Sequence, residues 1–582
     1  NTGTIDAAGG TVMLTSSVSK SLFDHAINNE GVIRAKDAEF KDGVIKLFGS
    51  GSSVLNTGSI DVSSEGAGVA GGQVTIESDS AVLISGSGNV RATSADGVGG
   101  QIKIDANSVA LADASSIDAS GAFGGGDVLV NASDSVLIDS GAAIRADALV
   151  AGDGGQISID ADAINVAGEL SARGGAESGD GGRIVLNATD VLSVSGILDV
   201  SADNGVNGSV NLSAPSVSIS DDGSDGSVDL SGVAGNIEIS AASRVDVNSV
   251  LSDMLDLGDS NLTISVNGTA ATSAESDAIA FVMSDANDTI STTGQITISV
   301  SDGSLNANSL IEVAGTLESK PFPEPLPNDP LAPANTISLA ANNGRVRVRN
   351  TGRLLATGLD ASQGQVRLIA TGYEADNDSG TVFFEGQIDV SNATGSGGSA
   401  KVLGDRVALQ GDANIDASGR TGGGEVLVGG SYQGKGPELN ARVAYVSEGS
   451  SIQVGASNGD GGQAVVWADG TTRYFGHIDG TASGQGANVE VSGKQHLTFQ
   501  GTVNLVGGEG KGTLLLDPQN IVIVSAGGDA VATNDEFAEN ATGTSNIDPG
   551  ALVTALDSAS LVLQAHDDIT VTDAVDASGG AA

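Results

Sequence analysis

The chain has 582 residues, of which 85 are Gly and only 3% are aromatic, and its formal net charge is −48. It holds no cysteine, which excludes disulfides, thiolate metal sites and a cysteine nucleophile. So acidic a surface repels nucleic acids and anionic lipids, and no apolar run of about 18 residues occurs, so we expect neither a nucleic-acid partner nor membrane insertion. The charges are spread evenly and 39% of residues are hydrophobic, which favours a folded chain.

The first predicted element is a repeat that fills residues 1–250. A Gly-containing turn leads into an apolar-x-apolar strand seven times, at intervals of 26 to 29 residues: Val74, Ile102, Val128, Ile157, Ile184, Val210 and Ile237. Two further short alternating pieces follow in each repeat, such as "SVALAD" and "SSIDASG". One repeat cannot bury its apolar face alone, but a stack of repeats can. We therefore predict an all-β fold, a right-handed parallel β-helix with three short strands and about 24–29 residues per rung.

The repeat weakens after residue 250. We predict an irregular insertion over 251–335, because the strand spacing is looser there and residues 321–333 hold six of the ten prolines. The period resumes over 336–525, which is predicted to be the second part of the β-helix. Residues 526–582 are predicted to start further β-helical repeats. We expect no cofactor: the Asp-rich stretch 220–227 is interpreted as a solvated turn, and the alternative is a site for a structural or nonspecific Ca²⁺ ion.

An aromatic patch near residue 470 is the main candidate site. It contains the only tryptophan, Trp467, together with Arg473, Tyr474 and His477. Period-2 alternation places Ala464, Val466 and Ile478 inward and Trp467 outward. One hypothesis makes Trp467 a platform for a sugar ring, with Arg473, Tyr474 or His477 as polar partners.

The other hypothesis, which we favour, is that an excursion of the preceding rung covers Trp467. This excursion, residues 431–445, would bring Tyr432 and Tyr445 close to the indole. Tyr432 therefore completes the set of candidate binding residues.

Two stretches resemble a known family. Residues 10–36, "GGTVMLTSSVSKSLFDHAINNEGVIRA", and residues 423–523, which include "GGQAVVWADGTTRYFGHIDG" and "GTLLLDPQNIVI", resemble two-partner-secretion exoproteins of the filamentous-haemagglutinin and high-molecular-weight adhesin type. The resemblance implies an extracellular or surface-anchored bacterial adhesin that is exported through an outer-membrane transporter. Its ligand would be a glycan, an exopolysaccharide or a cell-surface molecule. The family's secretion domain and C-terminal anchor are not recognised, so we expect the chain to be a fragment.

The sequence shows no catalytic constellation. The four histidines are scattered, and P-loop and zinc-protease patterns do not occur. We therefore expect a non-enzymatic adhesin. Two alternatives stay open: a β-helical polysaccharide lyase or hydrolase, and a passive stalk that presents a distal adhesive or toxin tip.

Overall fold

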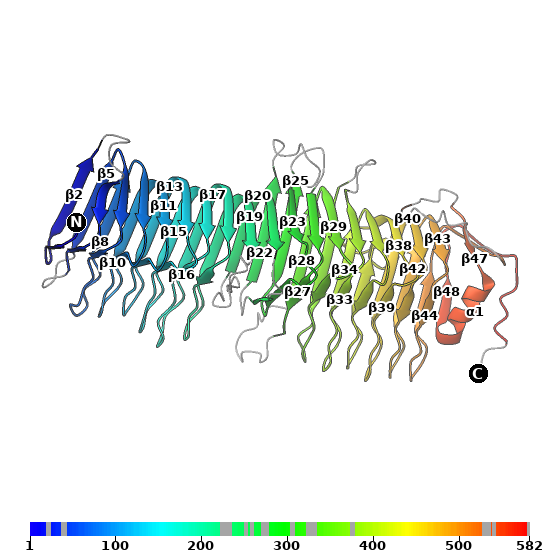
Figure 1. The fold of residues 1–582 in the computed structure, drawn as a ribbon. Helices are drawn as coiled ribbons and strands as arrows, with labels where there is room; N and C mark the ends of the chain where they lie inside the picture. Colours follow the sequence, from blue (N-terminus) through cyan, green and yellow to red (C-terminus); the bar gives the residue numbers. More distant parts are fainter. Residues whose placement is uncertain are drawn as a thin grey trace. The chain divides into compact units, whose positions relative to one another are not determined.

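A computed structural model describes residues 1–18, 25–36, 43–220, 236–248, 254–256, 261–268, 279–302, 309–321, 335–372, 379–525, 537 and 543–578. The chain divides into two compact units, Asn1–Ser265 and Val266–Ala582. In each unit, short strands pair in parallel with strands one rung earlier and one rung later (Figure 1). This pairing confirms the predicted parallel β-helix.

Unit 1 consists of stacked rungs whose strands form three parallel sheets. The third sheet has the order β1-β4-β7-β10-β12-β14-β16-β18. Its strands are β1 (Thr4–Asp6), β4 (Val32–Arg34), β7 (Ser59–Asp61), β10 (Asn89–Arg91), β12 (Ser116–Asp118), β14 (Ala143–Arg145), β16 (Glu169–Ser171) and β18 (Ile197–Asp199). The first two sheets are formed by β2 (Thr11–Ser17), β3 (His25–Asn29), β5 (Val44–Ser50), β6 (Ser53–Asn56), β8 (Gln73–Ser78), β9 (Ala81–Ile84), β11 (Gln101–Leu111), β13 (Asp127–Ile138), β15 (Gln156–Val166), β17 (Arg183–Val194), β19 (Ser209–Ser220) and β20 (Asn236–Asn248). The chain continues with β21 (Met254–Asp256) and β22 (Asn261–Gly268).

Aliphatic ladders fill the interior of unit 1. Ile102 pairs in register with Val74 on one side and Val128 on the other, and all three side chains are buried. Ile117 pairs in the same way with Ile144 in the third sheet. The alternation read from the sequence therefore identified the inward residues correctly, because a period of two sends alternate side chains to opposite faces.

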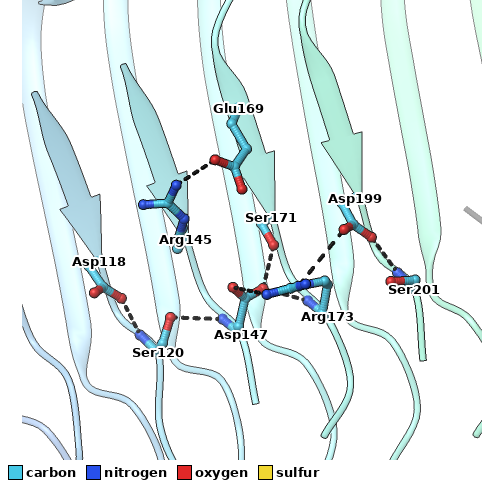
Figure 2. Close-up of polar contacts among 9 residues, drawn as sticks. All are labelled: Asp118, Ser120, Arg145, Asp147, Glu169, Ser171, Arg173, Asp199 and Ser201. Atoms are coloured by element: carbon cyan, nitrogen blue, oxygen red, sulfur yellow. Dashed lines mark hydrogen bonds and ion pairs between the residues drawn. The ribbon is translucent and has the colours of Figure 1, made fainter. Parts of the chain in front are cut away.

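Polar side chains connect the rungs of unit 1 at the corner that follows the third sheet (Figure 2). Asp147 is 1% exposed, and its Oδ1 accepts hydrogen bonds from the Ser171 hydroxyl and, at 2.8 Å, from the Arg173 backbone N–H. The Asp147 backbone N–H donates to the Ser120 hydroxyl at 3.2 Å. Burial raises the pKa of Asp147, although these hydrogen bonds and the Arg173 guanidinium, 3.7 Å away, oppose the shift. Side chains therefore add to the backbone ladder in holding successive corners together.

Unit 2 repeats the three-sheet design. Its first sheet contains β25 (Ile296–Asp302), β28 (Thr336–Asn342), β31 (Gln365–Ala370), β34 (Ser399–Gly404), β37 (Glu425–Val428), the first half of β40 (Gln463–Tyr474), β42 (Asn488–Gly493), β45 (Thr513–Leu516) and β48 (Ser560–Leu563). The second contains β23 (Ile279–Met283), β26 (Ser309–Val313), β29 (Gly344–Val348), β32 (Thr381–Phe384), β35 (Arg406–Leu409), β38 (Ala441–Val446), the second half of β40 and β43 (His496–Phe499). The third contains β24 (Thr289–Thr292), β27 (Thr316–Ser319), β30 (Arg353–Leu355), β33 (Gln387–Asp389), β36 (Asn414–Asp416), β39 (Ser451–Gln453), β41 (His477–Asp479) and β44 (Thr502–Asn504).

The structure corrects the prediction for residues 251–335. Within this range, β23 and β24 pair in parallel with β26 and β27, which in turn pair with β29 and β30. The described part of the range therefore belongs to the β-helix and is not irregular. Nearly all of the proline-rich run, from residue 322 onward, lies outside the described residues.

The predicted range of about 24–29 residues per rung is also too narrow for unit 2. Ile478 pairs with Val503, 25 positions later, but Ile415 pairs with Ile452, 37 positions later. The longer rung carries an excursion at one corner and keeps its strands in register. Sequence period alone underestimates the rung length where such an excursion occurs.

The last predicted segment, 526–582, contains a helix that the sequence did not predict. Helix α1 (Pro549–Ser558) begins after Asp548, whose side chain accepts a hydrogen bond from the Gly550 backbone N–H, and Pro549 occupies the first turn. The helix precedes β48, which pairs with β45. The small sheet β46 (Asn520–Ile523), β47 (Ser545–Ile547) and β49 (Asp568–Val571) completes the described residues, so β-pairing does continue here.

Candidate functional site

The five predicted site residues are spread over different faces of unit 2. Trp467 lies in the first half of β40, which pairs with β37. Arg473 and Tyr474 lie in the second half, which pairs with β38 in the second sheet. His477 belongs to β41 of the third sheet, and Tyr432 begins the short 3₁₀ helix η1 (Tyr432–Gly434) between β37 and β38. The structure therefore does not bring these residues together as one site.

Residues 429–440, hereafter the strap, cover Trp467. The indole is 4% exposed and packs with Leu427 and Val465 on the outer face of the first sheet. The strap approaches it so closely that a Cβ on Gly434 would lie 2.7 Å from the indole Cζ2 atom. This contact confirms the hypothesis of a covered tryptophan. The expectation that Tyr445 takes part is wrong, because Tyr445 lies on β38 and packs against Phe475.

Glu490 holds the central turn of the strap. It is completely buried on the outer face of β42, and its Oε2 accepts a hydrogen bond from the Gln433 backbone N–H at 2.7 Å. Gln433 has a φ of 53°, a left-handed conformation that is costly for a residue with a side chain. Burial, together with the charge of Asp517, raises the pKa of Glu490 to about 7. The strap is thus held by a carboxyl group that titrates near neutral pH.

Glu438 holds the strap at a second point. Arg367 on β31 donates to its carboxylate at 2.6 Å, and Lys401 on β34 donates to it at 2.9 Å. Partial burial would raise the pKa of Glu438, but these two cations outweigh burial and lower it. The strap therefore lies across the outer face of several rungs.

A groove runs beside the strap across the first sheet. It has a volume of about 670 Å³ and is open to solvent. Tyr432 forms part of its wall and is 46% exposed. The remaining lining residues are Gln363, Gly397, Gly398, Ser399, Gly423, Gly424, Glu425, Gly461, Gly462, Gln463, Asn488, Val489, Thr513 and Leu515.

The register of the β-helix produces this groove. Five consecutive rungs each place one polar residue on the same line, in the order Ser399, Glu425, Gln463, Asn488 and Thr513. Glycines precede four of them and form the floor, because a Cβ on Gly424 would lie 2.1 Å from the Gly398 carbonyl oxygen and one on Gly462 would lie 2.0 Å from that of Gly424. Adjacent rungs are about 4.8 Å apart, so the groove offers a hydrogen-bonding side chain at that interval.

The other three predicted residues lie away from the groove. Tyr474 points into the core, where it is fully buried, stacks on Phe499 at 5.6 Å between ring centroids and donates from its hydroxyl to the Thr502 carbonyl. Burial raises its pKa well above the usual tyrosine value. Arg473 is 5% exposed and lies over the Tyr445 ring, 5.8 Å from the centroid. Neither side chain is a surface partner of Trp467.

His477 lies in a second, separate pocket of about 620 Å³. Tyr445, Phe475, Gln500 and Glu448 are among its other lining residues, and the two aromatic rings are 5.9 Å apart. His477 Nδ1 is hydrogen-bonded to the Thr502 hydroxyl at 2.9 Å. We refer to this second concave surface of unit 2 as the aromatic pocket.

The groove residues were not predicted, although the sequence marks their position in each rung. Each occupies the position directly after the Gly-containing turn, as in "GGSAKV", "GGEVLV", "GGQAVV" and "GANVEV". Their side chains point outward because the next residue points inward. Glu438 and Glu490 carry no comparable signal, since their roles depend on where the strap folds back.

Within the described parts of the chain, no group of three or more His, Cys, Asp or Glu residues is placed to hold a metal ion. The Asp-rich stretch 220–227 lies, after residue 220, outside them, so the prediction of Ca²⁺ or no cofactor stays a prediction. Among the described helices, none is long and apolar enough to span a bilayer.

Comparisons with known proteins give little information on this chain. No family model matches it. No curated protein matches it either. Among solved structures, it is similar to the HMW1 secretion domain from Haemophilus influenzae, with 16% sequence identity and a TM-score of 0.25, over 80% of this chain and 94% of that one. A TM-score of this size is too low to support a conclusion about fold or function.

Proposed function

We propose that the chain is part of a secreted or surface-anchored bacterial adhesin, and that unit 2 binds an extended polysaccharide in the groove beside the strap. The observation that carries this proposal is the line of polar side chains on five consecutive rungs. Tyr432 adds an exposed aromatic face at the wall. Aromatic faces pack on the apolar side of sugar rings, while hydroxyl groups need polar partners.

The rung spacing supports an extended glycan as ligand. Parallel strands repeat at about 4.8 Å, which is close to the length that one pyranose ring adds to an extended chain. Successive sugars would therefore meet equivalent side chains on successive rungs. The β-helix and the resemblance of residues 10–36 and 423–523 to two-partner-secretion adhesins support an extracellular location and export through an outer-membrane transporter.

A catalytic role is not part of the proposal. Glycoside hydrolysis usually needs two carboxyl groups on either side of the scissile bond. Glu425 is the one acidic side chain among the residues that line the groove. A lyase or hydrolase would nevertheless be recognised by product release from the bound glycan, and a passive stalk by the absence of any glycan binding.

The test begins with a glycan array on the full chain, followed by calorimetric titration of the best uncharged oligosaccharide. We expect Tyr432→Ala to weaken binding by roughly three- to tenfold, the effect of losing one aromatic contact. Gln463→Ala should weaken it as well, because one hydrogen bond from the central rung is lost. Neither change should lower the melting temperature appreciably, since both side chains are on the surface.

Tyr445→Ala is the matched control, because it also removes a tyrosine side chain, but from the aromatic pocket. It should leave glycan affinity unchanged. If Tyr445→Ala abolishes binding while Tyr432→Ala has no effect, the ligand binds in the aromatic pocket and the groove proposal is wrong.

A further inference from the structure

Two cations on neighbouring strands of the first sheet converge on one carboxylate. Arg367 Nη1 lies 2.6 Å and Lys401 Nζ 2.9 Å from different oxygens of Glu438. The Glu438 side chain is 11% exposed, whereas those of Arg367 and Lys401 are 37% and 26% exposed. The carboxylate is thus held within a basic cradle that solvent still reaches.

This cradle is unusual for so acidic a chain. The sequence has 25 Lys and Arg residues against 73 Asp and Glu residues. Yet Arg367 and Lys401 are direct register partners on adjacent strands, where like charges repel each other. An anion between them removes this repulsion, and here the strap supplies it. The next anion, Glu425, is 3.7 Å from Lys401 and makes a longer contact.

The cradle lies beside the groove. Ser399, which lines the groove, is two residues before Lys401 on β34, and Gln365 is two residues before Arg367 on β31. Residues two apart on a strand point to the same face, so the cradle and the groove share the outer face of the first sheet. A ligand in the groove that carries a side group toward the strap would meet Arg367 and Lys401.

We propose that Arg367 and Lys401 form a carboxylate-binding subsite of the groove, occupied by Glu438 when no ligand is present. The ligand group it takes is the carboxylate of a uronic acid unit in a polysaccharide. Arginine binds carboxylates through two parallel donors, and hydrogen bonds to charged groups are stronger than neutral ones. Glu438 acts as an internal competitor, so its removal frees the subsite for the ligand. This inference rests on the groove being a glycan site.

The experiment compares a uronate oligosaccharide with its carboxyl-reduced, neutral counterpart at physiological salt, using wild type and Glu438→Gln. Glutamine keeps the shape of the side chain and removes its charge. We expect Glu438→Gln to bind the uronate oligosaccharide at least tenfold more tightly than wild type, and the neutral one equally well. Adding Lys401→Gln to this variant should abolish the gain.

The outcomes separate the two proposals. If Glu438→Gln gives no gain for the uronate oligosaccharide, the cradle is only an anchor of the strap and the subsite is wrong. The same conclusion applies if the strap detaches in this variant, because detachment exposes both cations to the ligand. Trp467 fluorescence would report such a detachment. If the neutral oligosaccharide binds to neither protein, the groove proposal fails. A gain for the uronate oligosaccharide would then show that the cradle binds a carboxylate by itself and is not a subsite of a glycan groove.

Discussion

Glu490 links the stability of the strap region to pH. Its pKa is about 7 in the folded chain, compared with 4.5 for an ordinary glutamate. Between these values the folded chain holds a proton that the unfolded chain has released, so stability decreases as pH rises. The stabilisation is fully present below about pH 4.5 and is lost as pH rises through 7. The free energy of unfolding therefore falls by roughly 3 kcal/mol between a pH below 4.5 and a pH above 7.

Glu490→Gln should remove this pH dependence. The amide oxygen still accepts from the Gln433 N–H, and no charge is buried at high pH. We expect the variant to be more stable than wild type at pH 8 and to differ less from it at pH 5. Urea unfolding followed by the fluorescence of Trp467, the only tryptophan, measures both values close to the strap. Glu448→Gln, which removes an exposed carboxyl group, controls for the change in net charge.

At the scale of elements, the strap is the feature that the sequence describes least well. An excursion after β37 was predicted from the extra residues between two repeats, and so was its position over Trp467. Its end was placed too late, because "ARVAYV" forms strand β38. The groove was not predicted, since it requires the register of five strands at once. The contacts of Glu438 span 71 positions to Arg367 and 37 to Lys401, which no local pattern encodes.

Trp467→Ala should detach the strap from the sheet. Removing a buried tryptophan side chain leaves a cavity, and we expect a loss of about 3 kcal/mol in the free energy of unfolding. Trp467→Phe keeps most of the packing and should cost much less. Circular dichroism during urea unfolding provides the measurement. If Trp467→Ala leaves stability unchanged but abolishes glycan binding, the indole contacts the ligand directly and the covering role assigned to the strap is wrong.

At the scale of the whole molecule, period and alternation were sufficient to predict the fold class. Inward positions such as Ile102 and Ile117 follow from the two-residue period, and stacking follows from the repeat. The helix α1 was missed because its apolar residues suit a strand as well. Its N-terminal capping residue, Asp548, gives no distinct signal either, because aspartate is also a common turn residue. The extent of the β-helix within 251–335 was missed because additional residues between its strands hide the sequence period.

The charge of the chain leads to a prediction at this scale. With a net charge of −48, repulsion between acidic side chains on stacked rungs opposes folding, and salt screens that repulsion. We expect the melting temperature to rise between about 0.02 M and about 0.5 M NaCl. Differential scanning calorimetry at fixed pH checks this. A melting temperature that falls with salt would mean that ion pairs such as Arg145–Glu169 dominate over the net repulsion.

The strap shows how a β-helix can acquire a long surface loop. Val426 still pairs with Ala464 before it, and Val443 with Thr471 after it, although twelve residues, 429–440, lie between the two strands. Alignment of the rungs is set by the backbone ladder and not by the length of the corner. Loop length and sequence can therefore vary at a corner, and change the outer surface there, without altering how the β-helix folds.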